Sequence, residues 1–245
     1  MANLSQQTDF ETLKLRKSTI EYLKNFATIN KSIVIRAGLV LSTMSVSKSI
    51  ISVCGMNDVF PADMAIYDLP LFLGALSLFD DPVLGFVDDK KVLIFDEKTK
   101  AKTTYYYSDP EMIVTVPKEF NLDLPDVDFN FDLPADDLAK LLKAAAVYGV
   151  EDICITGYKG EYSICVKDRK NQSSNVFSLP LQNVALNTAN SNVVLSEDEI
   201  CYCLKVENLK IIPGSYHVTI STRNASCWMA TGHSHLSYYI ALEPN

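Results

Sequence analysis

The chain has 245 residues, of which 22 are basic and 30 are acidic, so its formal net charge is −8 at pH 7. Proteins that hold DNA by neutralising its phosphates normally carry a surplus of Lys and Arg, so the overall charge argues against a tight DNA binder. A hydrophobic content of 48% and a charged content of 21% are typical of a globular chain, which argues against disorder.

The compartment is predicted from two features. The longest nearly apolar run, residues 69–79, is shorter than the roughly 20 residues that a membrane-spanning helix needs, and the N-terminal residues lack the basic and apolar segments of a secretory signal. We therefore expect a soluble intracellular protein. Its six cysteines lie in apolar or alternating stretches, which favours free buried thiols.

The first predicted helix covers residues 18–30. Ile20, Leu23 and Ala27 follow a helical period and form its predicted core stripe. Ser18 is the expected N-cap, and Glu21 would complete a capping box. The predicted outer face consists of Lys17, Glu21, Lys24, Thr28 and Lys31.

This helix lies in a basic island. Residues 12–36 hold six basic side chains and one acidic side chain, which gives +5 in a chain of −8. For any single lysine, a solvated helix face is the commoner explanation. The functional interpretation gains weight because outward lysines recur in the second half.

An acidic, proline-containing run divides the chain. Seven acidic residues and no basic residue lie between positions 119 and 137, together with Pro125 and Pro134. This pattern is typical of a linker. We predict an N-terminal domain over residues 1–118 with a short extension at 1–12, a connector at 119–128, and a C-terminal domain over 129–245.

The two halves repeat one pattern. Leu13, Leu15, Ile20 and Leu23 correspond to residues 118 positions later, and each series leads into a β-branched strand. The matching positions are Phe131, Leu133, Leu138 and Leu141. The repeat predicts two similar units.

The second unit is predicted to begin with a helix near Pro134. Its buried positions would be Leu138, Leu141, Leu142 and Ala145, with Lys140 and Lys143 facing outward. Lys205 and Lys210 flank a second, shorter helix. Alternating segments at 83–107 and 216–242 predict hairpins, so we expect an α+β fold with helices on one face of antiparallel sheets.

No motif of an active site is present. Gly157 and Gly160 bracket two residues and predict a hairpin turn, not a phosphate loop. Cys201 and Cys203 lack the spacing of zinc pairs, and the His233 and His235 pair has no third ligand at an obvious spacing. We therefore predict no catalytic residues, no metal site and no cofactor.

Three segments carry a family resemblance. The sequences LKNFATIN at 23–30, AIYDLPLFLGALSL at 65–78 and YYIALEPN at 238–245 resemble the DNA polymerase sliding clamps of large myovirus-type bacteriophages. The resemblance implies a homotrimeric ring of two-domain subunits that encloses double-stranded DNA without sequence specificity, in the cytoplasm of an infected bacterium. Seven lysines would face the duplex: Lys17, Lys24, Lys31, Lys140, Lys143, Lys205 and Lys210.

The resemblance also implies protein partners. The C-terminal peptide of the polymerase would bind an apolar pocket at the connector, and a clamp-loader ATPase would use the same face. The pocket residues implied are Phe120, Leu122, Tyr239, Ala241 and Leu242. Late transcription factors are further implied partners.

Subunit contacts in this family join edge strands of neighbouring subunits. The positions implied are Tyr105, Tyr107, Val114, Val116, Val176, Phe177 and Leu179. Two alternatives stay open: a β-rich adaptor or virion structural protein that does not bind DNA, and an enzyme whose site has no recognisable motif.

Overall fold

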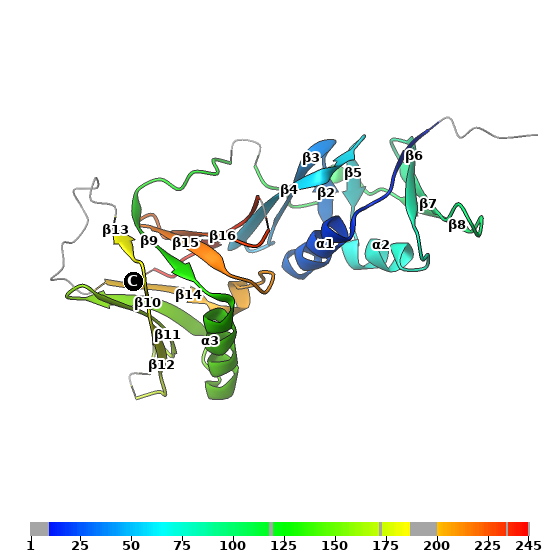
Figure 1. Cartoon of the computed structure of the whole chain (residues 1–245). Coiled ribbons are helices and arrows are strands. Elements are labelled where there is room, and N and C mark those ends of the chain that lie inside the picture. Colours follow the sequence, from blue (N-terminus) through cyan, green and yellow to red (C-terminus); the bar gives the residue numbers. More distant parts are fainter. Residues whose placement is uncertain (1–9, 118–119, 172, 187–199, 234, 245) are drawn as a thin grey trace, which may run out of the picture. The chain divides into compact units, whose positions relative to one another are not determined.

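The structure is a computed structural model that describes residues 10–117, 120–171, 173–186, 200–233 and 235–244. The chain divides into two compact units (Figure 1). Unit 1 comprises residues up to Thr43 and Cys54–Thr115, and unit 2 comprises Met44–Val53 and Val116–Asn245. Each unit is described by itself.

Unit 1 begins with a short strand and a helix, as the sequence predicts. Its elements are β1 (Glu11–Leu13), α1 (Lys17–Ile29), β2 (Ile33–Ile35), β3 (Gly38–Met44), β4 (Ile50–Phe60), β5 (Met64–Ile66), α2 (Leu69–Leu76), β6 (Val83–Asp88), β7 (Lys91–Phe95), β8 (Lys102–Tyr106) and the 3-10 turn η1 (Pro110–Met112). The first residues of β4 belong to unit 2, and its remaining residues belong to unit 1.

Unit 1 contains the four-stranded antiparallel sheet β1-β6-β7-β8 and the two-stranded antiparallel sheet β2-β5. The helices α1 and α2 contact each other (Figure 1). Leu23, Phe26 and Phe72 are fully buried. Burying each such side chain contributes roughly 1.5–3 kcal/mol, so the buried faces of the helices hold α1 in a fixed orientation.

Unit 2 begins in the same way, with a strand followed by a helix. Its elements are β9 (Val127–Leu133), α3 (Ala135–Tyr148), β10 (Asp152–Tyr158), β11 (Glu161–Lys167), β12 (Phe177–Pro180), β13 (Ala185–Leu186), β14 (Ile200–Lys205), the 3-10 turn η2 (Val206–Asn208), β15 (Tyr216–Ser221), β16 (Ala225–Ala230) and β17 (Leu236–Ala241).

Two sheets form unit 2. One has the order β12-β11-β10-β14, and the other runs β13-β9-β15-β16-β17 and continues to the start of β4. The helix α3 contacts β10, β11 and β12 (Figure 1). Buried aromatic rings fill the core, and Trp228 donates its indole N–H to Ser226 Oγ at 3.0 Å, which satisfies its one polar group.

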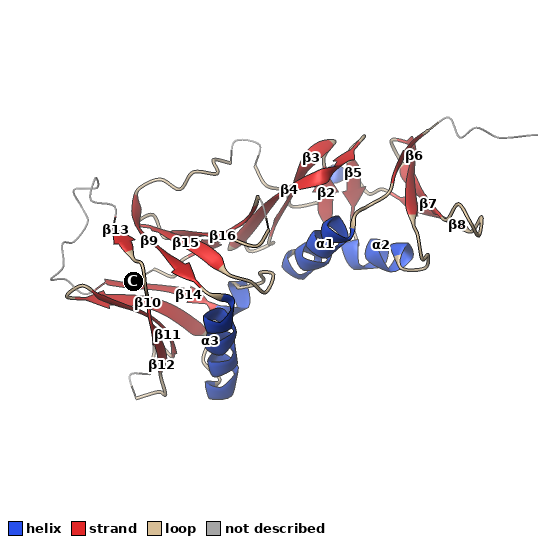
Figure 2. Ribbon diagram, in the orientation of Figure 1, coloured by secondary structure: helices blue, strands red, loops and turns tan. Residues whose placement is uncertain are grey.

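The predicted α+β class is confirmed, and Figure 2 displays the excess of strands over helices. Both predicted hairpin segments are antiparallel strands, β6 to β8 and β15 to β17. Lys159 and Gly160 have positive φ values of 49° and 81° in the tight β10–β11 turn, as a primed hairpin turn requires. Among the described residues, no helix is long and apolar enough to span a membrane.

The structure corrects several details of the first helix. It begins at Lys17 with Arg16 as N-cap, so the predicted cap at Ser18 is wrong. Its buried face holds Thr19, Tyr22 and Phe26 beside Leu23, whereas Ile20 and Ala27 are only half-buried. The face is rotated because the Tyr22 and Phe26 rings fill more space than the aliphatic stripe.

The cysteine prediction is partly wrong. Cys154 and Cys203 form a disulfide between neighbouring strands, whereas the other four cysteines are free. The connector also differs in extent, because Val127 and Asp128 belong to β9. Residues 1–9 of the predicted extension lie outside the described residues, and Glu11 and Thr12 belong to β1.

Candidate nucleic-acid and partner interfaces

The outer face of α1 carries the first predicted DNA contacts. Lys17 and Lys24 are seven residues apart and therefore project from nearly the same side of the helix, and both are exposed. Lys31 is also exposed but follows the C-cap, Asn30, so it lies just beyond the helix. Glu21 shares the face of Lys17 and Lys24, so these three side chains together with Lys31 carry a net charge of +2.

Ion pairing separates the six basic residues of the island into two groups. Three are paired with acidic residues distant in sequence, as Lys14–Asp81, Arg16–Asp58 and Arg36–Asp63. The other three, Lys17, Lys24 and Lys31, form no ion pair with any residue that the structure describes. Within this island, the cations without an ion pair to a described residue are therefore those on α1 and just after it.

On α3 the charges are more nearly balanced. Asp136 and Asp137 occupy the first turn, where the helix dipole stabilises negative charge. Lys140 pairs with Asp137 at 2.9 Å. This hydrogen bond and charge raise the pKa of Lys140. Lys143 is exposed and has no ion pair with a described residue, so it is the more available of the two cations.

Lys205 is the least available of the predicted lysines. Its Nζ lies 2.8 Å from Asp152 Oδ1 and 3.5 Å from Glu151 Oε2, and its side chain is only 24% exposed. The hydrogen bond to Asp152 raises the pKa of Lys205 and its charge is compensated locally. Lys210 lies two residues after η2 and is exposed.

The structure brings together three of the five predicted pocket residues. The rings of Phe120 and Tyr239 meet edge to face with centroids 5.0 Å apart, and the Tyr239 hydroxyl donates to the carbonyl of Leu122 at 2.7 Å. These contacts pin the connector to β17. Leu122 is 53% exposed, so an apolar side chain beside this cluster is open to a partner. The other two predicted pocket residues differ from each other, because Ala241 is exposed and Leu242 is buried.

Two of the predicted interface regions are edge strands. β8 ends the sheet β1-β6-β7-β8, and β12 ends the sheet β12-β11-β10-β14. An edge strand presents unpaired backbone N–H and C=O groups, which form a template for another strand. On β12, Phe177 and Leu179 are half-buried, and Val176 just before it is exposed.

Tyr105 on β8 and Tyr107 just after it, both expected at the subunit interface, pack within their own subunit instead. Tyr105 packs on Phe72 with ring centroids 5.2 Å apart, and Tyr107 packs against a buried cluster of Val34, Ala65 and Ile113. Burial raises the pKa of Tyr107 to about 12. Tyr106 is 70% exposed instead, and strand alternation between Tyr105 and Tyr107 is the signal that could have identified it. Val114 and Val116 are half-buried and follow η1 outside any strand.

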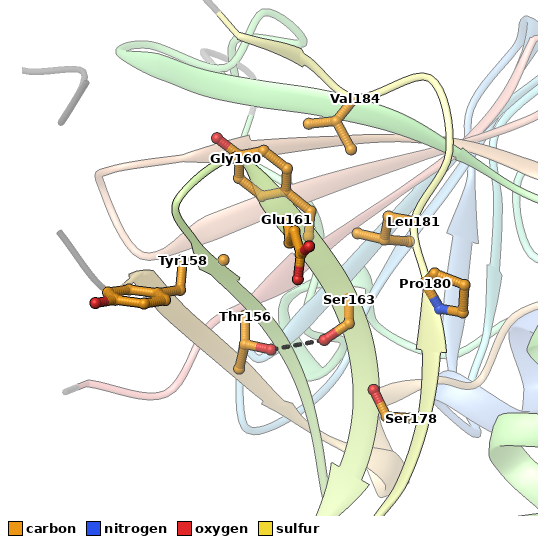
Figure 3. Close-up of a pocket in the computed structure, with 11 residues that line it drawn as sticks. Thr156, Tyr158, Gly160, Glu161, Ser163, Ser178, Pro180, Leu181 and Val184 are labelled. Atoms are coloured by element: carbon orange, nitrogen blue, oxygen red, sulfur yellow. Dashed lines mark hydrogen bonds between the residues drawn. The ribbon is translucent and has the colours of Figure 1, made fainter. Parts of the chain in front are cut away.

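A cavity of about 890 Å³ lies beside the β10–β11 turn (Figure 3). Thr156 and Ser163 hydrogen-bond across it at 2.9 Å, Ser178 adds another hydroxyl from β12, and Glu161 is its one carboxylate. Besides Glu161, the titratable side chains of this lining are Tyr158 and Tyr162, and no hydrogen bond joins Glu161 to Thr156, Ser163 or Ser178 among the described residues.

Together the fold and surfaces define a class: a clamp-type protein built twice from helix-covered sheets, with exposed lysines gathered on the outer face of one helix. A family described as "DNA polymerase processivity factor" matches residues 14–115, and "gp45 sliding clamp, C terminal" matches residues 130–244.

Individual proteins give the same result. The chain is 33% identical to the sliding clamp of Vibrio phage KVP40, over 94% of this chain and 99% of that protein, and 29% identical to the sliding clamp of Enterobacteria phage T4, over 94% and 97%. Its fold is similar to the proliferating cellular nuclear antigen of Entamoeba histolytica, with a TM-score of 0.65 at 14% identity over 95% of this chain and 98% of that one. The chain therefore belongs to the bacteriophage sliding clamps, which are non-enzymatic processivity factors.

Proposed function

We propose that this sliding clamp closes into a homotrimeric ring around double-stranded DNA and touches the duplex with its basic helical faces. The observation that carries the proposal is the exposed trio Lys17, Lys24 and Lys31, which forms no ion pair with a described residue in a chain of net charge −8. Enclosure holds DNA without tight phosphate binding, which suits a few cations on an otherwise acidic protein. Lys140, Lys143, Lys205 and Lys210 would complete the lining, with Lys205 contributing least because of its acidic partners.

Ring closure would pair β8 of one subunit with β12 of the next. Both are sheet edges, and half-buried apolar side chains on β12 would be covered by the pairing. Val114, Val116 and Val176 would extend the contact beyond the paired strands. The exposed Tyr106 would contribute more to the interface than Tyr105 or Tyr107, which pack within their own subunit.

The partner surface would lie where Phe120 and Leu122 meet Tyr239. We assign to it the C-terminal peptide of the polymerase and a clamp-loader ATPase, with late transcription factors as further partners. The functional division would follow the two predicted domains, with a connector that ends where β9 begins at Val127. The clamp would act in the cytoplasm of the infected bacterium.

The proposal is tested by loading the clamp with its ATPase onto nicked circular DNA and then cutting the circle. A ring slides off the free ends, so retention should disappear on linearisation and return when the ends are blocked. Retention on open linear DNA would contradict encirclement.

The DNA-facing surface is tested by reversing charge on Lys17 and Lys24. We expect Lys17→Glu with Lys24→Glu to weaken loading several-fold and to reduce the salt dependence of DNA association by about 1 in log–log slope for each lysine that no longer touches a phosphate. Lys90→Glu with Lys98→Glu is the matched control, because both residues are exposed on hairpin turns of the same unit. Equal behaviour of the two double variants would show that α1 does not face DNA.

A further inference from the structure

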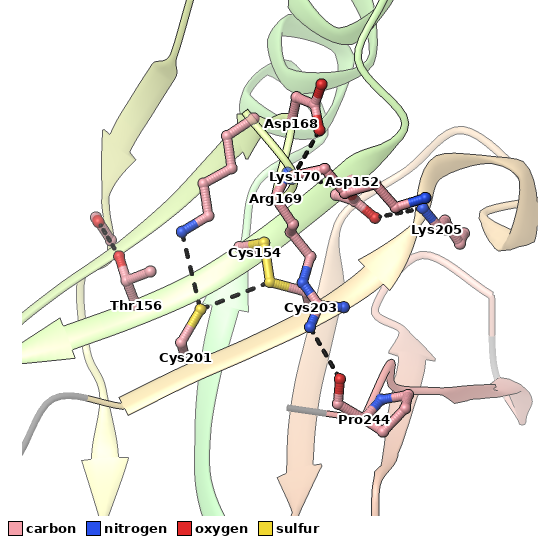
Figure 4. Close-up of a disulfide and its surroundings, with 12 residues drawn as sticks. Asp152, Cys154, Thr156, Asp168, Arg169, Lys170, Cys201, Cys203, Lys205 and Pro244 are labelled. Carbon is pink, nitrogen blue, oxygen red and sulfur yellow. Dashed lines mark hydrogen bonds and ion pairs between the residues drawn. A yellow bond between two sulfur atoms is a disulfide. The ribbon is translucent and has the colours of Figure 1, made fainter. Parts of the chain in front are cut away.

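Four cysteines of unit 2 lie near one another on a single sheet. Cys154 on β10 is directly opposite Cys165 on β11 and Cys203 on β14. Cys201 is two residues before Cys203, so both side chains project from the same face of β14, as Figure 4 shows. The cross-strand register therefore assembles a cluster whose members are up to 49 residues apart in sequence.

Three of these sulfurs lie close enough together to share one metal ion once the disulfide is open. Cys154 and Cys203 are joined in a disulfide, the Sγ of Cys201 lies 3.6 Å from the Sγ of Cys203, and all three atoms lie within 4.8 Å of one another. A zinc–sulfur bond of about 2.3 Å in a tetrahedral site separates two sulfurs by about 3.8 Å. We propose that Cys154, Cys201 and Cys203, once the disulfide is reduced, bind one thiophilic cation such as Zn²⁺.

The surroundings supply charge compensation. Three thiolates around Zn²⁺ leave a net charge of −1, and the Nζ of Lys167 lies 3.8 Å from the Sγ of Cys201. Lys205 is already paired with Asp152 at 2.8 Å, so Lys167 is the cation that offsets the thiolate charge.

A path to the site is also present. Cys154 and Cys203 are buried, whereas Cys201 is half-buried and lines a cavity of about 390 Å³ together with Lys167, Arg169 and Val176. A cation can enter from this side and keep water as its fourth ligand. An open fourth position is what three protein ligands leave on zinc.

Reduction and binding are separate, balanced steps. A phosphine reductant takes an oxygen atom from water to become the phosphine oxide, and the two electrons open the Cys154–Cys203 bond into two thiols. Zn²⁺ then displaces one proton from each of the three thiols that it coordinates.

The test compares zinc binding by the reduced and oxidised full-length protein. After anaerobic phosphine treatment and desalting, we expect one Zn²⁺ per chain in competition with a chromogenic chelator, and Co²⁺ should give thiolate charge-transfer absorption. The oxidised protein should bind neither ion. Absence of binding to the reduced protein, or equal binding to both forms, would overturn the proposal.

Variants locate the site. Cys201→Ser should lower zinc affinity by at least the roughly 10–100-fold that is typical for loss of a supporting residue around a metal, and Cys201→Ala serves if the serine variant is poorly folded. Cys54→Ser, in unit 1, should bind zinc like the unmodified chain. Unchanged affinity in a folded Cys201 variant would refute the assignment of this ligand set.

Discussion

The two units repeat one topology but differ at the segment that precedes the last hairpin. In unit 1 the sheet order is β1-β6-β7-β8, and in unit 2 the corresponding strands follow the same order, β9-β15-β16-β17. Between these strands, unit 1 has the eight-residue helix α2, whereas unit 2 has only the three-residue turn η2. The same sheet order therefore forms whether the preceding segment is a helix, as in unit 1, or a short turn, as in unit 2.

Local sequence explains the difference. Asp68 caps α2 by accepting the backbone N–H of Leu71 at 2.8 Å, and Pro70 fits the first turn of the helix. After η2, Ile211 and Ile212 are β-branched and Pro213 disfavours a helical conformation of the residue before it. Charge differs too, because α2 carries none whereas Lys205 and Lys210 flank η2.

The strongest test of the repeat removes one buried leucine from each unit. Leu23 and Leu141 are fully buried and stand 118 positions apart. Each Leu→Ala change should cost about 2–5 kcal/mol of unfolding free energy, because it leaves a cavity in a packed core. Denaturant unfolding followed by circular dichroism and by fluorescence of Trp228, the single tryptophan, measures the effect.

The two probes separate the units. Leu141→Ala should lower the fluorescence midpoint, because Trp228 lies in unit 2, and Leu23→Ala should lower mainly the circular dichroism transition of unit 1. Leu71→Ala on the exposed side of α2 is the control and should cost less than about 0.5 kcal/mol. If each core variant lowers the fluorescence and circular dichroism midpoints equally, the two units unfold together, which would contradict their separate stabilities.

A smaller difference is expected where the first helix of each unit begins. The N-terminus of α1 is fixed by Asp58, which accepts the backbone N–H of Arg16 at 2.8 Å and is buried, whereas Ser215 accepts the N–H of Ala135 at 3.0 Å in α3. Asp58→Ala should cost about 2–3 kcal/mol and Ser215→Ala about 1 kcal/mol, because hydrogen bonds to a charged acceptor are the stronger ones. Urea denaturation of both variants provides the measurement.

Asp58→Asn is the informative control for this pair. It keeps an acceptor oxygen but removes the charge, so its stability should fall between those of Asp58→Ala and the unmodified chain. A larger loss for Ser215→Ala than for Asp58→Ala would contradict the assignment of the charged cap to α1.

Much of the fold could be predicted because helical period and strand alternation are local signals. The period predicted α3 with its buried Leu138, Leu141 and Ala145, and the start near Pro134 agrees with the structure, whereas Leu142, also predicted as buried, is only half-buried. The phase of α1 could not be predicted from aliphatic residues alone, since Tyr22 is amphipathic and its burial depends on tertiary contacts.

The site was harder to predict because its electrostatics are long-range. The acidic partners of Lys14, Arg16 and Arg36 are 67, 42 and 27 residues away, so no local pattern separates these cations from the exposed lysines of the α1 face. The cysteine cluster depends in the same way on strand register.

The smallest expected effect concerns a hairpin turn of unit 1. Asp96 accepts the backbone N–H groups of Thr99 at 2.9 Å and Lys98 at 2.7 Å, and these bonds hold the pKa of Asp96 below its usual value. The ionised Asp96 carboxylate therefore stabilises the fold above the pKa of about 4 that Asp96 has in the unfolded chain. This contribution is lost as the pH falls through the lower pKa that Asp96 has in the folded chain. The β10–β11 turn of unit 2 also has positive φ values, at Lys159 and Gly160, as this turn has at Lys100, but no described carboxylate accepts its backbone N–H groups. Asp96→Asn should thus lower the urea midpoint at neutral pH, and its difference from the unmodified chain should shrink between about pH 5 and pH 3. A pH-independent difference would mean that the turn is held by geometry in both units.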